Sequence, residues 1–286
     1  MRLPTLQIKD TIFAQFTKSR PDDIRSGILV PVNSTANAFN SLEYALKLAK
    51  ILHNSIHIFY VIDISIDDLS ESTLVARRIL EKTYRKAENC VDSLREMIEE
   101  GGVKVVSADY RIGNIGSLIQ KQVEYIRPGM IVIGRDCFSK TTIDNLVSSV
   151  SCPVIAIPES ATPQLPSSIV LTNEHSTFPE KVIAPLIKIA QSTTQELTIL
   201  SFLKFKPKVE NVAVPHISTT KVLLKIQQID GSPSASTIGD FVQEKAVNLV
   251  CTTQQRQSLF KRLLKRSFSA EIVFGLNIPV MILREK

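Results

Sequence analysis

Seven residues that could hold a ligand stand where a predicted strand gives way to a helix. They are Asn33, Ser34, Gly113, Asn114, Gly134, Cys137 and Thr141. Hydroxyl and amide side chains at such places cap the first turn of a helix, and they also hydrogen-bond ligands. The N–H groups of the same turn attract anions. We therefore predict that these residues line a ligand-binding pocket.

A second group of residues is basic. It holds five cations with no acid between them: Arg256, Lys261, Arg262, Lys265 and Arg266. Such a concentration of positive charge suits anion binding, for example of a phosphorylated small molecule or an acidic partner protein. The alternative is a solvated helix face whose apolar residues turn inward. Because no nucleic-acid-binding motif accompanies the cations, nucleic acid is not the expected partner.

The histidines form no metal-binding or catalytic constellation. His53 and His57 are four residues apart, but Asn54-Ser55 ends the helix between them, so the two rings share no face for a metal ion. His175 has no nucleophile at a recognisable spacing, and we interpret it as a loop residue. The sequence therefore predicts no enzyme, no metal and no cofactor.

Cys137 has two interpretations. Arg135 and Lys140 are near in sequence and would lower the pKa of its thiol, which would make it reactive. The alternative is a small residue without a chemical role. The chain has 4 cysteines, widely scattered and without a CxxC pair, which argues against a disulfide framework or a zinc site.

Composition places the chain among folded proteins. Hydrophobic residues make up 44% and charged residues 22% of its 286 residues, well away from the range of disordered chains. The net charge of +6 falls in the second part, because residues 161–286 carry 15 Lys+Arg against 9 Asp+Glu. No apolar run is long enough to span a bilayer, and the first residues do not resemble a secretory signal. We expect a cytoplasmic protein with no membrane association.

The elements that position these residues alternate between strand and helix. Short β-branched runs at 27–32, 56–62, 103–106, 130–133 and 154–157 are separated by amphipathic helical patterns, the longest from about 70 to 100. This alternation is typical of βα units around a parallel sheet. Residues 25–158 are therefore predicted to form a five-stranded α/β domain, preceded by an extension over residues 1–24.

The same pattern restarts after a Pro/Ser-rich linker at 159–167. Strand patterns recur at 169–173, 197–200, 222–229, 248–251 and 278–282. The stretch 204–220 shows little helical periodicity, so the second copy is predicted to lack the long second helix. Residues 168–286 are thus expected to form a second domain of the same type.

The first predicted domain contains five short motifs in a fixed order. They are Val30-Pro31-Val32-Asn33-Ser34, a helix with Leu42, Ala45, Leu48 and Ala49, then Gly113, Ile133-Gly134 and Cys152-Pro153-Val154. Their order and spacing resemble the universal stress protein family, in a tandem arrangement. The resemblance implies an α/β fold of two tandem doubly wound domains, each with a five-stranded parallel sheet of the adenine-nucleotide α-hydrolase-like kind. It also implies that the two domains pair through their final strands.

The nucleotide-binding motifs of that family are degenerate here. Its ATP-binding branch has an Asp after the first strand, where this chain has Asn33 and Asn173. It also has glycines after the fourth strand, because phosphate oxygens must approach bare backbone N–H groups. The first domain keeps Gly134, but Cys137 replaces the next glycine in a shortened connection. In the second domain Thr253 to Arg256 contains no glycine, so neither domain is expected to bind ATP in the usual way.

These observations predict a binding or regulatory protein of the stress response, a homodimer that acts on a protein partner without catalysis. The alternative function is a sensor of a small ligand or nucleotide that uses the cleft of the first domain.

Overall fold

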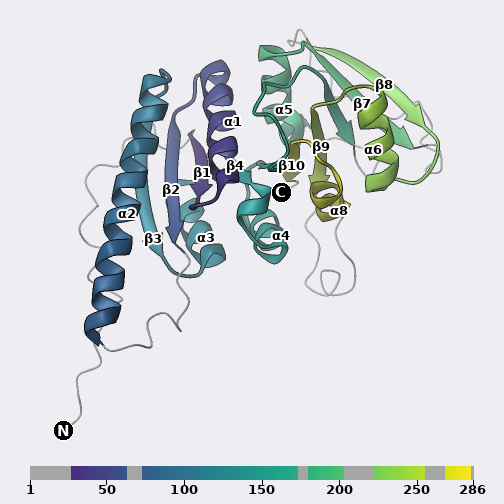
Figure 1. Ribbon diagram of the computed structural model, residues 1–286. Coiled ribbons are helices and arrows are strands. Elements are labelled where there is room, and N and C mark those ends of the chain that lie inside the picture. The colour runs from purple at the N-terminus through teal and green to yellow at the C-terminus, as the bar shows by residue number, and fades with distance from the viewer. Residues whose placement is uncertain (1–26, 63–72, 173–179, 203–221, 255–267, 285–286) are drawn as a thin grey trace.

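The computed structural model describes residues 27–62, 73–172, 180–202, 222–254 and 268–284 (Figure 1). We call residues 27–157 the first half. Its strands are β1 (Ile28–Val32), β2 (Ile56–Ile62), β3 (Val105–Ile112), β4 (Met130–Gly134) and β5 (Val154–Ile157). Its helices are α1 (Ala36–Leu52), α2 (Thr73–Glu100), α3 (Ile115–Ile126) and α4 (Lys140–Ser149), with a short 3₁₀ turn η3 (Arg135–Cys137) before α4. The five predicted strands are confirmed, although β3 is longer than expected and begins two residues later.

We call residues 169–284 the second half. Its strands are β6 (Ile169–Thr172), β7 (Glu196–Phe202), β8 (Leu223–Ile229), β9 (Leu249–Gln254) and β10 (Val280–Arg284). Its helices are α5 (Glu180–Ser192), α6 (Ala235–Glu244) and α8 (Phe268–Gly275). The five recurring strands are confirmed. The predicted loss of the long helix concerns residues 203–221, which lie outside the described residues, as do residues 1–26 of the extension.

All ten strands form one sheet in the order β3-β2-β1-β4-β5-β10-β9-β6-β7-β8. Within each half the neighbouring strands are parallel. The halves meet where β5 and β10 pair antiparallel, with Met281 opposite Ile155. The expected pairing through the final strands is therefore confirmed. Figure 1 shows the two halves side by side, with α2 at the outer edge of the first half.

The strand order determines where a ligand can reach each sheet. In the first half the chain runs outward from β1 to β3 and then returns to β4 on the other side of β1. Crossovers between parallel strands are right-handed, so this reversal sends the following helices to the opposite face and leaves a crevice at the strand ends. Gly113 has φ +141° and Gly231 has φ +114° at the corresponding turns before α3 and α6, a region that favours glycine.

Two arginines fasten each half to a helix of the other. Nη1 of Arg135 donates to the carbonyls of Val273 at 3.2 Å and Leu276 at 2.7 Å, at the end of α8. Nη1 of Arg284 donates to the carbonyl of Val150 at 2.5 Å, at the end of α4. A cation near a helix C-terminus also interacts favourably with the helix dipole. These contacts join the two halves on both sides of the β5–β10 pair, which we call the seam.

The predicted linker, residues 159–167, contains no helix or strand and is held by both halves. Nζ of Lys47 donates to the carbonyl of Pro163 at 2.5 Å, which fastens the linker to α1. The backbone N–H of Ser167 donates to Oδ1 of Asn248 at 2.9 Å, which fastens it to the second half. The segment therefore acts as a fixed connection.

No helix within the described ranges combines the length and the apolar surface that a bilayer crossing requires. The longest of them, α2 with 28 residues, carries charged side chains along its whole length.

Candidate ligand site in the first half

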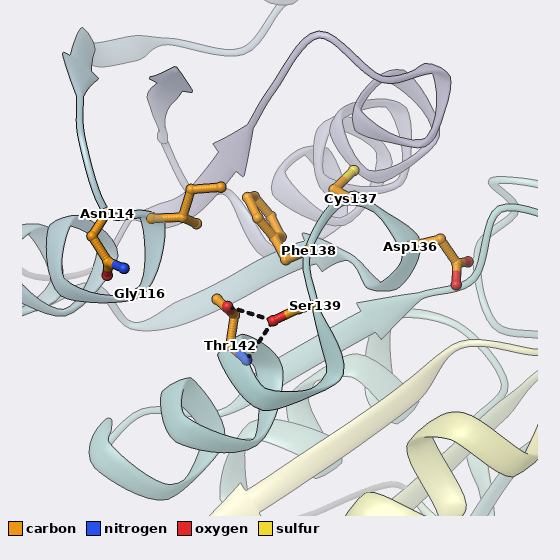
Figure 2. Close-up of a pocket in the computed structure, with 8 residues that line it drawn as sticks. Asn114, Gly116, Asp136, Cys137, Phe138, Ser139 and Thr142 are labelled. Carbon is orange, nitrogen blue, oxygen red and sulfur yellow. Dashed lines mark hydrogen bonds between the residues drawn. The ribbon is translucent and has the colours of Figure 1, made fainter. Parts of the chain in front are cut away.

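A cavity of about 240 Å³ lies at the carboxyl ends of the first-half strands, between the start of α3 and the start of α4 (Figure 2). It is lined by Asn114, Ile115, Gly116, Asp136, Cys137, Phe138, Ser139 and Thr142. Residues 136–139 come from the connection between β4 and α4, and the others come from the two helices. The cavity therefore lies at the crevice that the strand order creates.

Asn33, directly after β1, is bonded to the connection after β4. Its Nδ2 donates to the carbonyl of Cys137 at 2.7 Å. Its Oδ1 accepts from the N–H of Thr35 at 3.1 Å and from Oγ1 of Thr35 at 2.6 Å. Both ends of the amide are thus used within the protein. An Asp in the same orientation would place an acceptor against the Cys137 carbonyl, so the amide is required for this closure.

Both helices that border the cavity are capped by their own side chains. Oδ1 of Asn114 accepts from the N–H of Ser117 at 3.1 Å at the start of α3. Oγ of Ser139 accepts from the N–H of Thr142 at 3.2 Å at the start of α4, and its hydroxyl also bonds to that of Thr142 at 2.9 Å (Figure 2). These bonds satisfy one N–H in each first turn. Gly116, in the first turn of α3, lines the cavity with bare backbone.

The cavity wall carries one carboxylate, which is ion-paired with Nε of Arg135 at 3.2 Å. Asp136 is the one charged residue among the described lining residues, and its carboxylate accepts from the N–H of Glu159 at 2.8 Å. The two cations that flank the wall in sequence point to the second half. Arg135 bonds to the end of α8, and Nζ of Lys140 lies 5.3 Å from the ring centroid of Phe274. The wall thus lacks the positive charge that a triphosphate requires.

The thiol of Cys137 is not activated. Burial raises its pKa to about 11, and the carboxylates of Asp136 and Glu159 act in the same direction. The expected lowering of this pKa by Arg135 and Lys140 is wrong, because both cations point to α8. Sγ lies 3.1 Å from Oγ1 of Thr35, and this contact lowers the pKa by less than burial raises it. Cys137 is therefore a protonated, buried thiol.

The structure brings together only part of the predicted site. Asn114 and Cys137 line the cavity; Gly134 is buried at the end of β4, and Gly113 forms the turn before α3. Ser34 and Thr141 are exposed and do not line it. Six further residues line the cavity and were not predicted from the sequence: Ile115, Gly116, Asp136, Phe138, Ser139 and Thr142. Ser and Thr three apart at the start of a predicted helix form a capping pattern that could have identified Ser139 and Thr142.

The remaining candidates divide into two groups. His53 ends α1 and His57 lies on β2, as predicted, and the described ranges contain no cluster of three or more potential metal ligands. Arg256, Lys261, Arg262, Lys265, Arg266, His175 and Asn173 lie outside the described residues. Their predicted roles stay predictions.

Fold and site define a class of protein: an α/β protein of two tandem halves, each with a parallel doubly wound sheet and a crevice at its switch point. Residues 26–158 match the sequence family described as the universal stress protein family. The match covers the first half alone, and the second half repeats the same strand order. A comparison with curated proteins finds no match.

Solved structures support the same fold over nearly the whole chain. A universal stress protein from Archaeoglobus fulgidus DSM 4304 is 18% identical, with a TM-score of 0.72 over 91% of this chain and 96% of its own. A putative universal stress protein from Pseudomonas aeruginosa UCBPP-PA14 is 12% identical, with a TM-score of 0.60 over 91% and 93%. At such low identity these likenesses establish the fold alone.

Proposed function

We propose that this chain is a universal stress protein that works by binding, as a regulator of the stress response in the cytoplasm, and that it does not hold ATP in the family's usual way. The supporting observation is the closed wall of the first-half cavity. Asn33 ties the end of β1 to the Cys137 carbonyl, and the wall presents Cys137 and Phe138 where phosphates need bare backbone. The volume of about 240 Å³ is below the roughly 300–1,000 Å³ that is typical of ligand pockets.

A catalytic role is not supported by the described lining residues. The thiol of Cys137 has a pKa of about 11 and stays protonated at neutral pH, and the hydroxyls of Ser139 and Thr142 bond to each other at 2.9 Å. The carboxylate of Asp136 accepts from the N–H of Glu159 and from Nε of Arg135 at 3.2 Å, so it is bound within the protein. We therefore place the protein among binding proteins.

A nucleotide titration tests this proposal. The full chain is heated with ATP, AMP and cyclic AMP, each with Mg²⁺, and the unfolding temperature is followed against nucleotide concentration. Because a ligand that binds only the folded state stabilises it by RT ln(1 + [L]/Kd), a true site raises the temperature saturably. We expect no saturable rise with ATP. A saturable rise that Gly116→Leu removes would place ATP in the cavity and refute the proposal.

The second candidate function, a small-ligand sensor, rests on one observation: two capped helix starts border the same cavity. Such starts attract anions, and the volume of about 240 Å³ suits a small group better than a triphosphate. Gly116→Leu is again the discriminating variant, because a side chain at this position projects toward Asn114 and Thr142. A saturable rise with AMP or cyclic AMP but not ATP, removed by this variant, would favour the sensor.

We also propose two domains, residues 25–158 and 168–286, joined by the linker at 159–167, and a homodimer that engages a protein partner. In this chain β5 and β10 already pair with each other. A homodimer must therefore use another surface, and the outer strands β3 and β8 are the two edges of the sheet. Size-exclusion chromatography coupled to light scattering measures the mass of the particle. A monomer mass at all protein concentrations would refute the proposed homodimer.

A further inference from the structure

The second half contains a row of buried polar side chains at the ends of β6 and β9. Thr172 and Thr252 are both fully buried, and Cα register places them side by side on neighbouring strands. Gln254 follows two residues after Thr252 and therefore points to the same face of the sheet. Thr253 lies between them and points to the other face. The row thus consists of Thr172, Thr252 and Gln254.

Each of these three side chains has an oxygen atom without a hydrogen bond among the described residues. Oγ1 of Thr172, Oγ1 of Thr252 and Oε1 of Gln254 are buried atoms without a partner among the described residues. A buried hydroxyl or amide without a partner is unfavourable, and the large majority of such groups in folded proteins are satisfied. Single exceptions occur, but three adjacent ones on one face indicate a missing partner. Groups that weaken folding in this way are expected at functional sites.

Their position in the fold points to a ligand as that partner. The strand order reverses between β6 and β9, since β7 lies on the far side of β6. This is the switch point of the second half, the place where ligands bind in open parallel sheets. The matching strand ends of the first half are Val32 and Gly134, which have no polar side-chain atoms. The row is therefore specific to the second half.

We propose that Thr172, Thr252 and Gln254 form a binding site for a small uncharged polyol, separate from the first-half cavity. A hydroxyl can donate and accept, so the two threonines match adjacent hydroxyl groups, and the amide oxygen of Gln254 accepts one further O–H. The row itself carries no charge. Arg284, in register with Gln254 on β10, directs Nη1 to the carbonyls of Val147 and Val150 at the end of α4. These contacts favour a neutral ligand over an anion.

Isosteric variants test the site because stability and binding must change in opposite directions. Thr172→Val and Thr252→Val each remove a hydroxyl without a partner, so the urea midpoint of the ligand-free chain rises. The matched control is Thr193→Val, whose Oγ1 donates to the carbonyl of Ile189 at 2.8 Å, and its midpoint falls. A midpoint for Thr252→Val that falls as far as that of the control overturns the proposal, because this hydroxyl would then have a partner.

Binding is measured on the same proteins with myo-inositol and D-ribose as probes, by the saturable rise in unfolding temperature. We expect a saturable rise with at least one probe, at least tenfold weaker affinity in Thr252→Val, and unchanged affinity in Thr193→Val. A crystal structure of the chain grown with the probe then locates it. No saturable rise with either probe, together with density for ordered water alone beside Thr172 and Thr252, overturns the proposal.

Discussion

Arg135 is the side chain that joins the wall of the first-half cavity to the second half. Its guanidinium is largely buried, with 12% of the side chain exposed, and it donates to the carbonyls of Val273 and Leu276. Replacing it by Met keeps most of the packed volume, and it removes both of these bonds together with the ion pair to Asp136 at 3.2 Å. The last turn of α8 is then left without these partners for its carbonyl groups.

The expected cost follows from these contacts. A hydrogen bond from a charged donor contributes about 1.5–3 kcal/mol, and the 2.7 Å bond to Leu276 is the stronger of the two. The lost interaction with the helix dipole adds about 0.3–1 kcal/mol. Counting only the bond to Leu276 and the helix dipole, Arg135→Met should lower the free energy of unfolding by at least about 2–4 kcal/mol.

Urea denaturation followed by far-UV circular dichroism measures this loss. Arg95→Met on the exposed surface of α2 is the control, and a surface change of this kind shifts stability by no more than about 0.5 kcal/mol. Arg284→Met, at the reciprocal contact with α4, should resemble Arg135→Met. If Arg135→Met matches the Arg95→Met control, the two carbonyl contacts do not hold the halves together and the reasoning is wrong.

Three further outcomes are expected. Cys137 should react with iodoacetamide slowly at neutral pH and faster as the pH approaches about 11, where its raised pKa releases the thiolate; rapid modification at pH 7 in the folded chain would contradict this. Asn33→Asp should lower the free energy of unfolding by about 1–3 kcal/mol, since a carboxylate cannot donate to the Cys137 carbonyl, and an unchanged urea midpoint would count against the closure. Gly275→Ala should lower the free energy of unfolding by about 1–3 kcal/mol, because its Cβ would lie 2.5 Å from that of Ala235. The control Gly239→Ala, with 3.6 Å to its nearest neighbour, should be neutral or stabilising. Equal urea midpoints for the two variants would disprove the clash.

Most of the fold could be predicted from local pattern. The apolar runs at 56–62 and 154–157 coincide with β2 and β5, because a strand buried on both faces requires continuous apolar residues. The long helix begins at Thr73 and ends at Glu100, close to its predicted bounds. The repeated order of elements indicated two halves, and the β5–β10 pair joins them as expected.

The candidate site was less predictable because its walls come from segments distant in sequence. Asn33 was expected to face a ligand, but its amide is bonded to the Cys137 carbonyl, which lies 104 residues later in the chain. Thr141 was expected at the site, but the helical turn points Thr142 into the cavity instead. Helix phase and loop length decide such details, and neither can be derived from residue type.

The amino-acid sequence by itself determined which segments become strands and helices and that the pattern occurs twice, since these depend on the periodicity of neighbouring residues. Only the tertiary structure decided where the charged side chains point. Arg135 and Lys140 are near Cys137 in sequence, yet both reach across the seam to α8 and leave the thiol protonated. Likewise, only strand register places Thr172 beside Thr252, 80 residues apart in the chain. Contacts between distant segments depend on how the elements pack, and that packing sets the chemistry of both sites.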